Sequence, residues 1–320
     1  MSEFSKNKKQ KLSFLDHLKT SFLEYCEVEK GKSQKTISNY DHYLTRFILW
    51  VKANYNIQKP EEISLDVVRK YRLWLNRLRG KNGPLKKITQ NYHIIALRAW
   101  LKYLARHDIK TLPAEKIELS KIPSRVVEFL SGEELERLLL KPDIRNLKGL
   151  RDRAILEMLF STGLRISELV SLNRNQVSPS KDEFTVRGKG DKPRLVFLSD
   201  EARFWLKKYL QKRTDNLLPL FISHSKKKKD IQNPNSQRLT ARSIQRMVKR
   251  YALLSGLTKK VTPHTLRHSF ATDLLSNNAN IRSVQAMLGH ASLSTTQIYT
   301  HVTNQELKKI HKACHGRKRR

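Results

Sequence analysis

The residues with the clearest chemical potential lie near the C-terminus of this 320-residue chain. Thr262 and Pro263 predict the N-cap and the first turn of a helix. His264 and Arg267 follow them three residues apart, so both side chains lie on one face of that helix. Two side chains of types that bind phosphate are therefore directed toward one point.

A histidine and a tyrosine follow this pair. Gly289 predicts the left-handed end of a short helix, and His290 lies just outside it. Ser292 or Ser294 can cap a last helix that carries Tyr299. A phosphodiester repels nucleophiles, and its pentacovalent transition state gains negative charge, so cleavage without a metal needs several fixed cations. The cluster therefore predicts attack of the phenol on a phosphodiester.

Two further candidates lie upstream. Arg165 precedes Glu168 by one helical turn, so its guanidinium can bind two nonbridging phosphate oxygens while the carboxylate holds it in place. Lys189 lies at the tip of a glycine-rich turn, from which it can protonate a leaving 5′ oxygen. Taken alone, each residue is better explained by a surface ion pair or a solvated turn. The ordered combination favours phosphoryl transfer.

The charge of the chain indicates a polyanionic partner. Its 64 Lys and Arg residues against 29 Asp and Glu residues give a formal net charge of +35. This charge exceeds what solubility needs. The excess is spread along the whole chain, whereas basic membrane helices concentrate their charge in one segment. Nucleic acid is therefore favoured over a membrane surface.

Several other classes of function lack their motifs. Cys26 and Cys314 lie at opposite ends of the chain and offer neither a disulfide framework nor a metal-ligand spacing. No HEXXH motif and no GxxxxGKS/T loop occurs, so we expect neither a metal nor a cofactor. The N-terminus has no apolar signal region, and no run approaches about 18 apolar residues. We expect a cytoplasmic protein without a membrane partner.

Hydrophobic periodicity predicts a mainly α-helical chain with a small β-sheet. Four apolar stripes between residues 14 and 106 predict a compact helical domain, and a second domain begins with a helix after Ser131. The β-rich runs 184–187 and 194–198 flank GKGDKP and predict a hairpin. In order, we expect a basic tail over 1–12, a helical domain over 13–107, an extended linker over 108–127 and an α/β domain over 128–320.

The ordered set of Arg165 in TGLRISEL, Lys189 in the GKG turn, HTLRH, LGH and Tyr299 resembles the tyrosine recombinase (phage integrase) family. Within that family it most resembles the Xer site-specific recombinases. The resemblance covers nearly the whole chain, because the helical N-terminal part resembles the family's SAM-like core-binding domain. It implies a two-domain, C-shaped clamp on double-stranded DNA at a recombination site.

The resemblance also implies the chemistry. Tyr299 would attack the scissile phosphate to give a 3′-phosphotyrosyl enzyme and a free 5′ hydroxyl, which keeps the bond energy and needs no ATP. A free phenol has a pKa near 10, so it needs assistance, which the resemblance assigns to His264. Lys189 is the implied general acid towards the 5′ oxygen.

The remaining roles carry over in the same way. Arg165, Arg267 and His290 are implied to stabilise the transition state, and Glu168 to orient Arg165. The family works as a tetramer on two sites and passes through a Holliday junction. Residues 303–313 suit the family's C-terminal helix, which docks on a neighbouring subunit; a basic tail that contacts DNA is the alternative left open.

Two departures from the family leave the target site and the partners open. The loop over 222–239, with KKKK at 226–229, looks longer than usual, and the terminal GRKRR is unusually basic. A second Xer-like recombinase and an activating DNA translocase are possible partners that the sequence does not specify.

Several functions share these motifs. Only about a dozen residues precede the first expected helix, so we expect no arm-binding domain, which favours Xer-type chromosome dimer resolution over a phage or mobile-element integrase. A noncatalytic DNA-binding protein is disfavoured because all six catalytic positions are present. A type IB topoisomerase is the remaining alternative, against which the expected tail helix argues.

Overall fold

The computed structural model describes residues 13–80, 83–122, 128–188, 193–224, 233 and 235–289. The chain divides between Ser124 and Arg125 into two compact units, each with its own hydrophobic core. Several expectations lie outside the described residues: the tail over 1–12, Lys189, the KKKK run, His290, Tyr299 and the helix expected after it.

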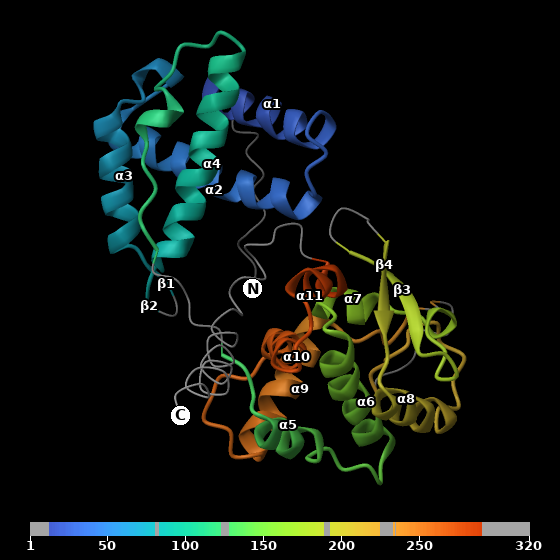
Figure 1. Ribbon diagram of the computed structural model, residues 1–320. Helices are drawn as coiled ribbons and strands as arrows, with labels where there is room; N and C mark the ends of the chain where they lie inside the picture. Colours follow the sequence, from blue (N-terminus) through green and yellow to red (C-terminus); the bar gives the residue numbers. More distant parts are fainter. Residues whose placement is uncertain are drawn as a thin grey trace, which may run out of the picture. The chain divides into compact units, whose positions relative to one another are not determined.

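The first unit contains the four long helices that the apolar stripes predict (Figure 1). Ser13, Ser33 and Ser64 each accept a backbone N–H bond at the start of one of them. Such caps satisfy donors that the first turn of a helix leaves without partners. The helices are α1 (Phe14–Val28), α2 (Gln34–Tyr55), α3 (Leu65–Arg77) and α4 (Lys87–Arg106).

Large aromatic side chains fill the core between these helices. Trp100 of α4, Tyr71 of α3 and Phe47 of α2 are fully buried. The Phe47 and Tyr71 rings meet edge to face, with their centroids 5.0 Å apart. Because an aromatic side chain buries about 150–250 Å² of surface, these three residues join α2, α3 and α4 into one core.

The segment 108–122, where we expected the first part of an extended linker, belongs to the first unit. A 3₁₀ helix, η2 (Ala114–Lys116), interrupts it, and Ala114 and Ile117 are buried in the helical core. Two apolar residues three apart lie on one side of a single turn. Hydrophobic periodicity cannot reveal a helix of one turn, so this packing could not be predicted from the sequence.

The second unit surrounds α6 (Leu147–Thr162), which is buried along most of its length. α8 (Asp200–Gln211) and α10 (Pro263–Ser276) pack against it. Arg153 and Glu157 of α6 form an ion pair of 2.7 Å, which offsets the cost of enclosing their charges. The other helices are α5 (Gly132–Leu139), α7 (Ile166–Ser171), η3 (Arg174–Gln176), α9 (Ala241–Leu254) and α11 (Ile281–Leu288).

The hairpin expected in the second unit is present. β3 (Glu183–Arg187) and β4 (Pro193–Phe197) pair in antiparallel register, with Phe184 opposite Val196. Phe184, Val186 and Val196 are buried. Since a slip of one residue would turn these side chains to the other face of the sheet, their burial fixes the register.

A second, shorter hairpin lies in the first unit, where β1 (Arg79–Gly80) pairs with β2 (Gly83–Pro84). The sequence did not predict it, because two-residue strands are too short to show alternation. The other short helix of this unit is η1 (Pro60–Glu62). The predicted fold class, mainly α-helical with a small β-sheet, is confirmed. Among the described residues, no helix is both long and apolar enough to cross a membrane.

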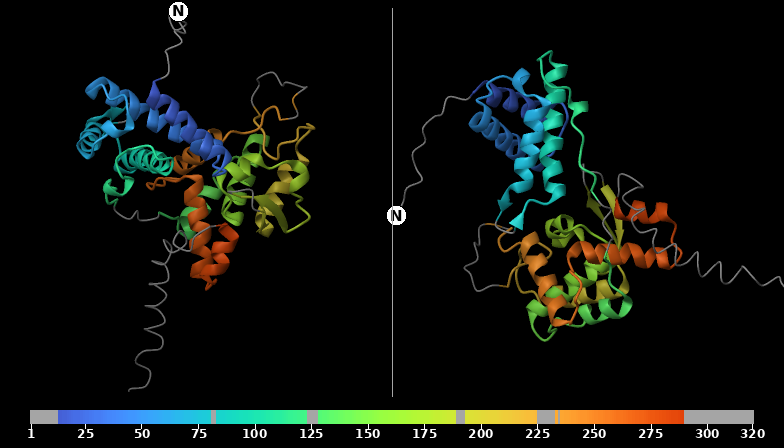
Figure 2. Two further views of the ribbon diagram at one scale, coloured as in Figure 1. Left: turned by 90° about the horizontal axis from the view of Figure 1, so that it is seen from above. Right: turned by 90° about the vertical axis from the view of Figure 1, so that its left-hand side faces the viewer.

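Three helix ends shape the region where α6, α10 and α11 meet, and α11 packs against α10 (Figure 2). α6 ends at Gly163 with φ +58° and α11 ends at Gly289 with φ +62°, a left-handed conformation that favours glycine. Thr262 caps α10 by accepting the Thr265 N–H at 3.2 Å. The start predicted at residue 262 and the left-handed end predicted at residue 289 are confirmed.

Candidate active site

Arg165 lies in the turn that joins α6 to α7. Its backbone N–H donates to Glu168 Oε2 at 2.8 Å, and its Nη1 donates to Glu168 Oε1 at 2.9 Å. The carboxylate one turn later thus holds both the backbone and the guanidinium of Arg165. The Arg165 side chain remains 26% exposed, so it is oriented by the protein and still accessible to a ligand.

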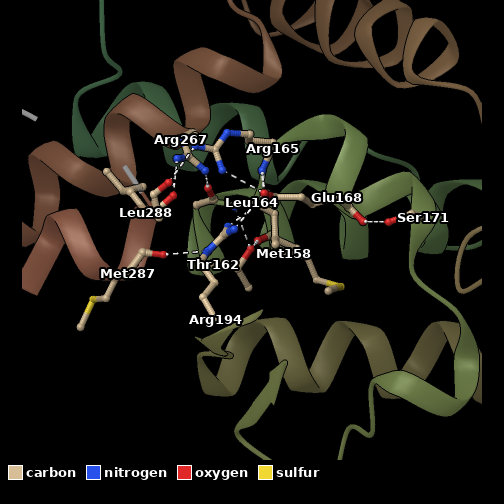
Figure 3. A network of polar contacts seen from close by, with 12 residues as sticks. Met158, Thr162, Leu164, Arg165, Glu168, Ser171, Arg194, Arg267, Met287 and Leu288 are labelled. Atoms are coloured by element: carbon tan, nitrogen blue, oxygen red, sulfur yellow. Dashed lines mark hydrogen bonds and ion pairs between the residues drawn. The ribbon is translucent and has the colours of Figure 1, made fainter. Parts of the chain in front are cut away.

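Arg267 lies deeper, on the first turns of α10, with an exposed fraction of only 3%. Its Nη1 donates to the carbonyl of Gly163 at 2.5 Å, and its Nη2 donates to the carbonyl of Leu288 at 2.6 Å (Figure 3). Carbonyls at a helix end carry partial negative charge and lack intrahelical partners. The buried guanidinium of Arg267 therefore joins the ends of α6 and α11.

Arg194 of β4 is a third arginine in this cluster. Its Nη1 and Nη2 donate to the two carboxylate oxygens of Glu168, each at 2.8 Å. Its Nε donates to the carbonyl of Met287 at 3.2 Å. Figure 3 shows this side chain reaching Glu168 and Met287 together. Two parallel bonds to one carboxylate fix both groups in a plane.

The end of α11 accepts hydrogen bonds from all three arginines. The carbonyls of residues 287–289 accept, in order, from Arg194, Arg267 and Arg165. The last of these bonds, from Arg165 Nη2, measures 3.1 Å. Three cations from three different elements thus converge on one helix end. The next residue in the chain is His290.

Glu168 is the shared anion of the cluster, and only 6% of its side chain is exposed. Burial alone would raise the pKa of its carboxyl. Hydrogen bonds from the Arg194 guanidinium, the Arg165 backbone and the Arg165 guanidinium, together with the Arg194 charge, outweigh that effect. They lower the pKa of Glu168 from 4.5 to about 2, so it is ionised at neutral pH.

Two histidines of α10, His264 and His268, lie beside the arginine cluster. His264 lies on the outer side of the first turn, where desolvation and the charges of Arg267 and Arg165 lower its pKa. Burial, His264 and Arg267 lower the pKa of His268 to about 4. Both shifts favour the neutral imidazole at neutral pH, and a neutral imidazole can accept a proton.

The described residues bring together half of the predicted catalytic set. Arg165 and Arg267 converge, and His264 lies one turn before Arg267 on the same helix. The other three predicted residues, Lys189, His290 and Tyr299, lie outside the described ranges. Within those ranges, no group of His, Cys, Asp or Glu side chains is placed to hold a metal ion.

Arg194 is the member of the cluster that sequence reasoning missed. It was expected only as part of a β-rich run. A signal was present, because alternate residues of a strand share a face and Arg194 is in step with the buried Val196 and Leu198. A charged side chain on a buried face requires a partner, which here is Glu168.

Both units of this chain are similar in sequence to known proteins. Residues 128–306 match the phage integrase family, and residues 20–108 match the phage integrase N-terminal SAM-like domain. The tyrosine recombinase XerD of Lacticaseibacillus casei is 39% identical over 297 residues, which cover 92% of this chain and 97% of that protein.

Solved structures agree with this similarity. The crystal structure of XerA recombinase is 30% identical and has a TM-score of 0.51, covering 95% of this chain and 99% of that chain. The XerH site-specific recombinase, solved in a post-cleavage complex with a palindromic difH substrate, has a TM-score of 0.68 at 23% identity. That match covers 91% of this chain and 83% of the XerH chain and concerns the fold alone.

Proposed function

This chain belongs to the phage integrase family of site-specific tyrosine recombinases, and we propose that it cuts and rejoins double-stranded DNA with Tyr299 as nucleophile. The proposed intermediate is a 3′-phosphotyrosyl enzyme, and exchange of two pairs of strands passes through a Holliday junction. The proposed catalytic residues are Arg165, Lys189, His264, Arg267, His290 and Tyr299.

The convergence of Arg165 and Arg267 on the end of α11 carries this proposal. A pentacovalent phosphorus centre bears more negative charge than the diester, so cations fixed in advance stabilise it without reorganisation. Helix ends, the carboxylate of Glu168 and burial fix both guanidiniums here. His290 follows Gly289, the C-terminal cap of α11, in the sequence, which suits it to the same phosphate.

A cavity of about 400 Å³ next to Arg165 suits the scissile phosphate. Arg165 and Arg187 bring positive charge to its lining, and Ser167 and Ser171 bring hydroxyl groups. Glu168 also lines it, with its carboxylate bound by Arg165 and Arg194, and Gly188 completes the lining. Phosphate sites commonly combine such charge-assisted and neutral donors. Lys189 follows Gly188 in the sequence, which supports its proposed role as proton donor to the 5′ oxygen.

Proton transfer completes the proposed chemistry. As the phenolic oxygen of Tyr299 forms a bond to phosphorus, His264 takes the phenolic proton. The bond between phosphorus and the 5′ oxygen breaks, and Lys189 protonates that oxygen. The lowered pKa of His264 supports this assignment, because it leaves the ring neutral and able to accept a proton at neutral pH.

We further propose that both units bind a recombination site, the first as a core-binding domain and the second as the catalytic domain. The net charge of +35 and the two domain matches support this. The proposed active form is a synaptic tetramer, and the proposed role is the resolution of chromosome dimers; the similarity to a tyrosine recombinase named XerD supports an Xer-type enzyme. A second Xer-like recombinase and a DNA translocase are candidate partners, and integration of a mobile element is the alternative role.

Strand exchange between two DNA copies of a candidate site tests the proposed function. Wild type and Arg165→Ala would be compared, with Arg145→Ala as the control because Arg145 is an exposed arginine of the same unit. We expect a Holliday junction and recombinant product from wild type and from the control. Loss of one transition-state donor should slow Arg165→Ala by about 10²–10³-fold.

Each other outcome identifies an alternative. Relaxation of supercoils without recombinant DNA would indicate a topoisomerase. Binding without strand cleavage, even with candidate partners added, would indicate a noncatalytic DNA-binding protein. The location of the functional site in the source genome would separate the two recombinase roles, since a site at an element boundary would contradict dimer resolution.

A further inference from the structure

We propose that Arg194 is a positioning residue of the active site, which holds Arg165 and the end of α11 in their catalytic arrangement without touching DNA. This inference rests on the proposed function. It adds a residue from strand β4 to the helix-end residues Arg165 and Arg267.

The contacts of Arg194 support this role more directly than its charge does. All three of its guanidinium nitrogens donate inside the protein: Nη1 and Nη2 to Glu168 at 2.8 Å, and Nε to Met287 at 3.2 Å. The side chain is only 9% exposed. Its donors therefore point at the groups that hold the site rather than outward at a phosphate.

Glu168 transmits the effect of Arg194 to Arg165. The same carboxylate accepts from Arg194 through both oxygens and from Arg165 through both oxygens. A carboxylate tied only to Arg165 would be free to rotate with it. With Arg194 bound on its other side, Glu168 has one orientation, and Arg165 is aligned to match it.

The Nε and Cδ atoms of Arg194 contact the end of α11. Its aliphatic stem lies so close to Gly289 that a Cβ at that position would be 3.0 Å from Arg194 Cδ. The hydrogen bond from Arg194 Nε to the carbonyl of Met287 holds the side chain against this helix end. Removing Arg194 would leave a gap beside the helix end from which His290 follows. Both the Arg165 guanidinium and the end of α11 would lose a fixed support.

Single-turnover cleavage of a nicked substrate tests this role. Wild type would be compared with Arg194→Ala, Arg194→Lys, Arg165→Ala and the double variant. We expect cleavage by Arg194→Ala to be about 10²-fold slower, because small misplacement of a catalytic group costs about that much. The affinity for DNA should change by less than about threefold, since Arg194 contributes no phosphate contact.

The double variant separates positioning from general structural damage. If Arg194 acts through Arg165, adding Arg194→Ala to Arg165→Ala should slow cleavage little further, because coupled residues are not additive. Arg203→Ala is the matched control, since Arg203 pairs with Asp200 on α8 outside the cluster, and it should cleave like wild type.

Three results would overturn the inference while leaving the recombinase proposal intact. Arg194→Ala could cleave within about threefold of the wild-type rate, or its weaker DNA affinity could account for its slower cleavage. The third is a double variant in which the two reductions in cleavage rate multiply. If Arg194→Ala unfolds at the assay temperature, Arg194→Lys decides by the same criteria. Lysine keeps the charge but cannot make the two parallel bonds. Failure of wild type to cleave would instead contradict the proposed function.

Discussion

At the residue scale, the candidate active site is organised around one buried carboxylate and three guanidiniums. The sequence predicted Arg165, Glu168 and Arg267, because their spacing on helices is visible locally. It did not predict the role of Arg194, which lies 26 residues from Glu168 and meets it only through the tertiary fold. Local patterns identify pairs within an element, whereas contacts between elements require the folded structure.

Glu168→Gln tests the electrostatics of this cluster. The folded-state pKa of about 2 lies below the ordinary value of 4.5, so the ionised carboxylate stabilises the fold above pH 4.5 and loses that contribution as the pH falls toward 2. We expect the substitution to lower the free energy of unfolding by about 3 kcal/mol at pH 7. The difference from wild type should shrink below pH 4.5.

Urea unfolding between pH 3 and pH 7 measures that difference. Glu136→Gln is the control, because Glu136 is an exposed glutamate of the same unit. A stability loss for Glu168→Gln that stays constant across this range would show that the ionised carboxylate is not the stabilising group.

At the element scale, the ends of helices position the site. Gly163 ends α6 and accepts from Arg267, and Gly289 ends α11 and accepts from Arg165. The sequence predicted the caps at residues 262 and 289 because capping depends on a few adjacent residues. The β3–β4 hairpin was predictable because its two β-rich runs and the turn between them are also adjacent in the sequence. The sequence could not predict that separate helix ends would meet, since that follows from the packing of α10 against α6 and α11.

Gly163→Ala tests the importance of these helix ends. Gly163 has φ +58°, and a Cβ there would lie 2.5 Å from Phe270 Cδ1. The left-handed conformation alone costs a non-glycine residue about 1–2 kcal/mol. We expect a larger loss of stability than this, and slower DNA cleavage because the carbonyl that fixes Arg267 must move.

Gly256→Ala is the matched control, since Gly256 has φ +67° and no atom within 4 Å of the added Cβ. Its free energy of unfolding should fall only by the cost of the left-handed conformation, about 1–2 kcal/mol, and its cleavage rate should not change. Thermal unfolding and single-turnover cleavage would be measured on both variants. Equal effects of the two substitutions would exclude a special role for the end of α6.

At the scale of the whole molecule, the dominant feature is the positive charge. The net charge of +35 was readable from composition. Two domains joined by an extended linker over 108–127 were also predicted; in the structure residues 108–122 belong to the first unit, where Ala114 and Ile117 are buried. Short turns of this kind bury too few residues to leave a periodic pattern.

This charge predicts a steep dependence of DNA binding on salt. If the two units together neutralise 6–10 phosphates, affinity should fall by about 10³–10⁵-fold between 50 and 200 mM salt. Fluorescence anisotropy with a labelled duplex measures the affinity across that range. A change of less than about tenfold would mean that phosphate contacts contribute little to binding.

The central claim, that Tyr299 attacks the scissile phosphate without a metal, is tested most directly by trapping the covalent intermediate. Wild type, Tyr299→Phe and the control Tyr55→Phe would be incubated with a nicked suicide substrate in a chelator. Denaturing gels and peptide mapping would then locate any attached DNA. We predict a 3′-linked adduct on the peptide that contains Tyr299, formed by wild type and the control and absent from Tyr299→Phe. An adduct on another residue, or one that persists in Tyr299→Phe, would contradict the claim.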